Sequence, residues 1–204
     1  MSGSPGLWQR WGVWQKYGAR GVKGGEALIM EINRIVYQSG ISSPATSKRG
    51  MNARLRYLDS AAGREALRNQ GVSDRALKSW MKGKATPSPA NRERIDNAYW
   101  ERKRENLIRS GWLKRHLDNN GAGRRIEIYP VDESNVPQPY RRTEGTHRNL
   151  TNRSVTVRYI WNDLVDAWAN QDADMMDEIW EDIISDLDSD WTAYAYVSSV
   201  GIAA

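Results

Sequence analysis

The sequence predicts an α+β protein that is mainly helical, and three observations lead to this prediction. Apolar residues recur at helical spacing through residues 25–118, whereas short alternating segments occur only after residue 119. A stretch in the first half, REALRNQGVSDRALKSWMKGKATPSP, has the layout of a helix-turn-helix. The last part of the chain is strongly acidic. We therefore expect a flexible Trp-containing segment (residues 1–24), a helical helix-turn-helix domain (25–118) and a small α+β unit with about three strands (119–204).

Length and composition exclude several classes of protein. A chain of 204 residues can bury one or two hydrophobic cores. It has no cysteine, so disulfides and thiolate metal sites are excluded and a reducing cytoplasm is expected. The two histidines, His116 and His147, lie in unrelated contexts, so we expect no metal site, no cofactor and no catalytic triad. The sequence contains no apolar run long enough to cross a membrane and no secretory signal at its start.

The N-terminal half contains the first predicted helices. Trp residues recur at every third position near the start, which predicts a short amphipathic strap over the core: Trp8, Trp11 and Trp14. The glycine-rich segment 17–25 lacks the spacing of a phosphate-binding loop and is expected to be flexible. Helices are then predicted over Glu26–Gln38 and from Met51 to Leu58, the second with Arg54 on its outer side.

The helix-turn-helix is predicted from the residues around one glycine. Leu67 ends the apolar face of the first helix, and Gly71 stands where the chain must reverse. Val72 then provides an apolar side chain that can enter the core after the turn, and Ser73 can cap the second helix. The second helix has an inward face at helical spacing and ends at a glycine: Ala76, Leu77, Trp80 and then Gly83.

The opposite face of that second helix is polar and basic, as expected of a helix that reads the major groove. We expect four residues to contact base edges: Asp74, Arg75, Lys78 and Ser79. Five further residues are expected to contact phosphates: Arg54, Ser73, Lys82, Lys84 and Arg92. An ordinary solvated helical hairpin is the alternative interpretation of the same pattern.

A long helix, Pro89–Ser110, is predicted next, with Ser88 as its cap. It mixes basic and acidic residues, so it is either solvated and held by internal ion pairs or a contact for phosphates. Beyond it we expect strands at Arg125–Val131, Ser154–Ile160 and Trp191–Val200, a long basic loop over 132–153, and helices at Trp161–Asn170 and Ala173–Leu187.

Charge is divided unevenly along the chain. From Ile160 onward there are 11 carboxylates and no Lys or Arg, so the first 159 residues have all 30 basic residues and 14 acidic ones, a net charge of +16. A basic body of this kind favours a polyanionic partner. The acidic part could dock a protein, balance charge or restrain non-specific binding. Its pair Asp182 and Asp186 could bind Mg²⁺, but a solvated helix face is the simpler interpretation.

The segment Gly71–Pro89 is similar to helix-turn-helix regulators and replication proteins. More remotely, the chain resembles the terminal proteins that cap linear replicons of actinobacteria. The matching stretches are Gly71–Gly83, Pro89–Ser110, Arg125–Val131 and the acidic tail. That resemblance implies that one hydroxyl becomes linked to a nucleotide to prime synthesis, with a polymerase supplying the chemistry. The candidates in the basic loop are Tyr140, Thr143, Thr146 and Thr151.

Together these features lead us to expect a non-enzymatic protein of the cytoplasm, at the nucleoid, that binds double-stranded DNA. Its role would be replicon maintenance at linear DNA ends. The alternatives are a dimeric transcriptional regulator, a module that binds RNA or single-stranded DNA through exposed Trp and Tyr, and a protein-interaction module. A homodimer and a protein partner of the acidic unit are further expectations.

Overall fold

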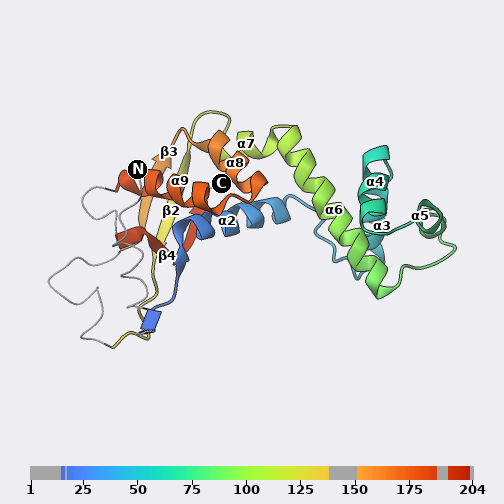
Figure 1. The fold of residues 1–204 in the computed structure, drawn as a ribbon, viewed down its shortest axis with the longest axis horizontal. Coiled ribbons are helices and arrows are strands. Elements are labelled where there is room, and N and C mark those ends of the chain that lie inside the picture. Colours follow the sequence, from blue (N-terminus) through green and yellow to red (C-terminus); the bar gives the residue numbers. More distant parts are fainter. Residues whose placement is uncertain (1–14, 17, 138–150, 188–192, 203–204) are drawn as a thin grey trace. The chain divides into compact units, whose positions relative to one another are not determined.

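The computed structural model describes residues 15–16, 18–137, 151–187 and 193–202, and Figure 1 shows its fold. The prediction of an α+β protein that is mainly helical is confirmed. The chain divides into two compact units. We call residues 35–112 the helical unit, and residues 1–34 together with 113–204 the sheet unit. The helical unit is therefore shorter at both ends than the predicted domain over residues 25–118.

Four helices of the helical unit begin in the same way. They are α3 (Lys48–Tyr57), α4 (Ala61–Asn69), α5 (Asp74–Met81) and α6 (Pro89–Arg109). Each is preceded by a serine whose hydroxyl accepts a hydrogen bond from a backbone N–H of the first turn: Ser47, Ser60, Ser73 and Ser88. Such caps satisfy donors that a helix start leaves without a partner, which explains why the helices begin at these residues.

The core of the helical unit gathers around α6, beside which α3 and α4 lie (Figure 1). Ile95, Ala98 and Tyr99 of α6 are at most 1% exposed. They pack with buried side chains from the other helices and the turn: Met51, Leu55, Leu58, Ala66, Leu67, Val72 and Leu77. This single apolar cluster holds α5 against the rest of the unit.

The sheet unit is built on four antiparallel strands in the order β1-β4-β2-β3. They are β1 (Val22–Lys23), β2 (Arg124–Pro130), β3 (Arg153–Val157) and β4 (Tyr196–Ile202). Ile126 pairs with Val155 of β3 and with Ile202 of β4, and all three side chains are buried. Their neighbours Arg125, Ser154 and Thr156 are exposed, so the sheet has one apolar face.

Helices supply the other half of this core. They are α2 (Gly24–Gln38), α7 (Trp112–Leu117), α8 (Trp161–Asn170) and α9 (Ala173–Ser185). Three tryptophans, Trp161, Trp168 and Trp180, are at most 4% exposed. The indole N–H of Trp180 donates to the carbonyl of Tyr194 at 2.9 Å, and that of Trp168 donates to Asn33 Oδ1 at 3.0 Å. Burial and hydrogen bonding together lock these indoles in place.

The sequence predictions differ from the structure mainly near the N-terminus. The segment up to residue 24 was expected to be flexible, yet Val22 and Lys23 pair with Val197 and Tyr196 as a fourth strand. A Cβ at Gly24 would overlap the indole of Trp180, so this glycine permits close packing. The helix α7 was not predicted. The predicted strap of Trp8, Trp11 and Trp14 lies outside the described residues.

Candidate nucleic-acid interface

The turn between α4 and α5 has the local geometry that its sequence predicts. Gly71 has a φ of +75°, a conformation that residues with a Cβ rarely adopt. Its N–H donates to the carbonyl of Arg68 at 2.8 Å, and that of Val72 donates to the carbonyl of Leu67 at 2.9 Å. The Val72 side chain is 3% exposed and enters the core. The turn is therefore fixed both by backbone bonds and by burial.

Helix α5 is held to the unit along one side only. Leu77 is 2% exposed, and Ala76 and Trp80 are half-buried against the same core. At the other end of α5 the chain turns at Gly83, whose φ is +67° and whose N–H donates to the carbonyl of Trp80 at 3.0 Å. Both boundaries of α5 and its inward face agree with the prediction from sequence.

The opposite side of α5 faces solvent. Arg75, Lys78 and Lys82 are exposed, as is Lys84 beyond the end of the helix. Asp74 is also exposed, but its Oδ2 accepts a hydrogen bond of 3.2 Å from Arg68 of α4. The other two predicted contact residues differ from these: Ser79 is half-buried, and the hydroxyl of Ser73 accepts the N–H of Ala76 at 3.2 Å. The structure thus brings most of the predicted contact residues onto one exposed surface.

Arg54 was predicted to contact phosphate, and the structure contradicts this role. The residue is 3% exposed, and its Nε forms an ion pair with Asp96 of α6. Its Nη1 donates to the carbonyls of Ser43 and Gly50, at 2.8 and 3.2 Å. The guanidinium carbon lies 5.2 Å from the centre of the Tyr99 ring. Arg54 is therefore a structural residue, because its donors are taken up inside the unit and a phosphate could not reach them.

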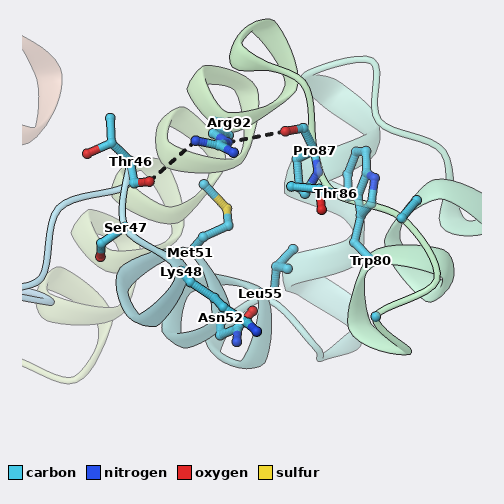
Figure 2. Close-up of a pocket in the computed structure, with 12 residues that line it drawn as sticks. Thr46, Ser47, Lys48, Met51, Asn52, Leu55, Trp80, Thr86, Pro87 and Arg92 are labelled. Carbon is cyan, nitrogen blue, oxygen red and sulfur yellow. Dashed lines mark hydrogen bonds between the residues drawn. The ribbon is translucent and has the colours of Figure 1, made fainter.

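Arg92, like Arg54, donates hydrogen bonds to two backbone carbonyls, although it is only half-buried. Its Nε donates to the carbonyl of Pro87 at 3.2 Å and its Nη1 to the carbonyl of Thr46 at 3.3 Å, as the dashed lines in Figure 2 show. These bonds tie the segment before α3 to the segment before α6. Arg92 also lines a cavity of about 420 Å³, which no sequence pattern predicted.

Of the four hydroxyls that the resemblance to terminal proteins suggests for linkage to a nucleotide, only that of Thr151 belongs to a described residue. Tyr140, Thr143 and Thr146 lie outside the described residues. Thr151 is exposed, and its backbone carbonyl accepts a hydrogen bond of 2.8 Å from the hydroxyl of Tyr194. Thr151 thus belongs to the sheet unit.

The two units carry opposite net charges. The helical unit has 16 Lys and Arg against seven Asp and Glu, a net charge of +9. The sheet unit has 14 basic and 18 acidic residues, a net charge of −4. The division of charge predicted at Ile160 is therefore not the division between units, since the acidic helices α8 and α9 share a unit with basic strands. A net positive charge of this size favours association with polyanions.

Sequence reasoning also missed an aromatic stack in the helical unit. The ring of Tyr37 lies on that of Trp100, with centroids 5.1 Å apart and an interplanar angle of 22°. Trp100 in turn meets the edge of Tyr99. Tyr37 is 69% exposed, so one face of the stack is open to a partner. Further along α6, partial burial lowers the pKa of Lys103 and of Arg104.

In comparisons with known proteins, no family model, no curated protein and no solved structure matches the chain. Among the described residues, no group of three or more His, Asp or Glu side chains is placed to hold a metal ion. Over the same part of the chain, no helix combines the length and apolarity needed to span a membrane. A functional assignment therefore depends on the α5 surface and its charge.

Proposed function

We propose that the helical unit binds double-stranded DNA and that α5 lies in the major groove. The observation that carries this proposal is the amphipathic character of α5, which has one buried apolar face and one exposed basic face. Its apolar side is buried through Leu77, while Arg75, Lys78 and Lys82 project from a unit with a net charge of +9. A helix held from behind on a rigid core can enter the groove without unfolding its own unit.

The residues of this surface differ in what they can bind. Arg75 and Lys78 can donate to guanine acceptors, the carboxylate of Asp74 can accept from the amino group of cytosine, and the hydroxyl of Ser79 can donate or accept. Lys82 and Lys84 follow at the end of the helix, and Ser73 stands at its start, where phosphates are usually contacted. Arg54 has no part in this set, because its charge is used inside the core.

The biological role that we propose is replicon maintenance by a binding protein of the nucleoid that does no chemistry of its own. The resemblance to terminal proteins of linear replicons favours DNA ends as the site of action. The alternative is a transcriptional regulator. A homodimer would then place two α5 helices on successive major grooves, about 34–36 Å apart. The exposed acidic side chains of α8 and α9 would offer a protein partner a surface of opposite charge to the helical unit.

The proposal is tested by anisotropy titrations of the full chain with labelled duplex DNA, single-stranded DNA and RNA. A selected duplex site and random duplexes of equal length should be compared. Arg75→Ala should cost about 1–3 kcal/mol on the selected site and much less on random DNA. Lys84→Ala should weaken both about equally, because a phosphate contact is independent of sequence.

Arg109→Ala is the matched control, since Arg109 is equally exposed but lies at the far end of α6 from α5. It should change the affinity for the selected site less than either of the other substitutions. Equal effects of all three variants on selected and random DNA would show that α5 does not read bases. Failure of the wild-type chain to bind any duplex would remove the proposal itself.

A second candidate function follows from the aromatic stack. The open face of Tyr37, supported from behind by Trp100, is suited to stacking on an unpaired base. This favours binding of RNA or single-stranded DNA. Tyr37→Ala separates the two candidates. It should abolish single-strand binding if the stack is the contact, while leaving duplex binding through α5 intact.

A further inference from the structure

The cavity of the helical unit lies beside the proposed recognition helix. It has a volume of about 420 Å³ and is partly open to solvent. Its walls come from the start of α3, the end of α5 and the segment that leads into α6. Figure 2 shows Arg92 spanning the distance between Thr46 and Pro87, so two of these walls are joined by hydrogen bonds.

The floor of the cavity is apolar. Met51 and Leu55 are buried, and the half-buried Trp80 also lines the cavity (Figure 2). The volume falls in the range of small-molecule sites, about 300–1,000 Å³. The combination of an aromatic wall and aliphatic floor is suited to a flat ring system, because such a ring can lie on the indole and exclude water from the aliphatic side chains.

The ionisable side chains that line the cavity are both basic. Lys48 is exposed at the rim, and Arg92 is half-buried in the wall. Among the described residues that line the cavity there is no carboxylate, although carboxylates are present elsewhere on α5 and α6. A negative charge on an occupant would therefore meet two cations and no repulsion.

We propose that this cavity binds a small organic anion with a flat aromatic body. The ring lies against Trp80 and Leu55, and the anionic group lies at the rim near Lys48. The site depends only on the cavity and its charges. Its consequence for DNA rests on the proposed function: an occupant touches Trp80, which belongs to α5, and so changes the position from which α5 meets the groove.

The test uses the full chain and two matched probes. One is 8-anilinonaphthalene-1-sulfonate, an anion whose naphthalene ring is flat. The other is N-phenyl-1-naphthylamine, which has the same rings without the sulfonate. The first should bind saturably with one site per chain, and at least fivefold more tightly than the second. Non-saturable fluorescence, or equal affinity for both probes, would overturn the proposal.

Variants locate the site. Lys48→Glu should weaken binding of the anionic probe about tenfold, because an attraction is replaced by a repulsion. Arg49→Glu is the matched control. It is the next residue of α3 and is also exposed, but it does not line the cavity, so its effect should be smaller than threefold. Equal weakening by both variants would show a general effect of charge and would overturn the site.

A filling variant provides an independent test. Asn52 is exposed and lines the cavity, so Asn52→Trp should abolish binding of the anionic probe without disturbing the core. Ala85→Trp fills the same space from the opposite wall and serves if the first variant does not fold, as judged by circular dichroism. Unchanged binding by a folded filling variant would place the probe elsewhere and overturn the proposal.

The coupling to DNA is measured separately, by titrating duplex DNA in the presence and absence of the anionic probe. A change in duplex affinity that disappears in Asn52→Trp supports the coupling, and no change overturns it. Failure of the chain to bind DNA at all would remove the proposed function but leave the probe titrations standing. The two failures are therefore distinguishable.

Discussion

The helical unit and the sheet unit solve the same problem of burial with different residues. The helical unit is one continuous stretch of chain with an aliphatic core around Tyr99. The sheet unit is assembled from both ends of the chain and buries three tryptophans. The first has a net charge of +9 and the second −4. Along the sequence the basic residues end before Ile160, whereas the two units divide after residues 34 and 112. Only the division into units therefore shows that the net positive charge belongs to residues 35–112.

The largest effect is expected in the core of the sheet unit. Trp180 is fully buried, its N–H donates to Tyr194, and Gly24 packs against its ring. Trp180→Ala should lower the free energy of unfolding by about 3–5 kcal/mol, because a large cavity and a lost hydrogen bond add up. Chemical denaturation followed by circular dichroism measures this. Tyr159→Ala is the control, since Tyr159 is 64% exposed and should lose little. An equal loss of stability in both variants would show that burial of Trp180 does not stabilise the sheet unit.

The stability of the helical unit should depend on the ion pair between the buried Arg54 and Asp96. Arg54→Ala leaves Asp96 without its partner and should lower the free energy of unfolding by about 3 kcal/mol, at the lower end for buried pairs because Asp96 is partly exposed. Arg56→Ala, two residues further along the same helix and exposed, should change it by less than about 0.5 kcal/mol. If Arg54→Ala weakened duplex binding while stability stayed unchanged, Arg54 would be a phosphate contact after all.

How much of this could be predicted from the sequence depends on the range of the interactions. The bounds of α5, its cap at Ser73 and the turn at Gly71 follow from neighbouring residues, and the sequence predicts them well. The pairing of β1 with β4 joins residues 22 and 197, and no local pattern signals it. The same limit applies to the candidate site. That Arg75 and Lys78 are exposed follows from helical periodicity, but the burial of Arg54 depends on Asp96, which is 42 residues away.

A smaller effect is expected from the acidic surface of α9. Partial burial, and then the carboxylates of Asp177, Glu178 and Asp182, raise the pKa of Glu181. The folded state thus holds this proton more firmly than the unfolded chain, so stability falls as pH rises from about 4.5, the ordinary value, through the raised pKa. Glu181→Gln should therefore stabilise the protein at neutral pH, by less than about 1 kcal/mol. The gain should vanish well below pH 4.5, where wild-type Glu181 is neutral too. A gain that persists there would assign the effect to packing.

The smallest effect concerns the influence of the acidic helices on DNA binding. Truncation near Arg153 would remove β4, which lies between β1 and β2, so charge neutralisation is the cleaner change. The combined variant Asp163→Asn, Asp166→Asn and Glu178→Gln alters three exposed carboxylates. Duplex affinity should rise about two- to threefold at low salt and return to the wild-type value at high salt. An unchanged affinity at low salt would favour the alternative role of this surface in docking a protein.

The assignment of DNA binding to α5 is tested by titrating the ¹⁵N-labelled full chain with duplex DNA and recording its amide chemical shifts. The two units are then compared in one sample. We predict that the shifts concentrate at the amides of residues 73–84 and that those of α8 and α9 stay unchanged. Shifts confined to the sheet unit, or spread equally over both units, would contradict the assignment of DNA binding to α5.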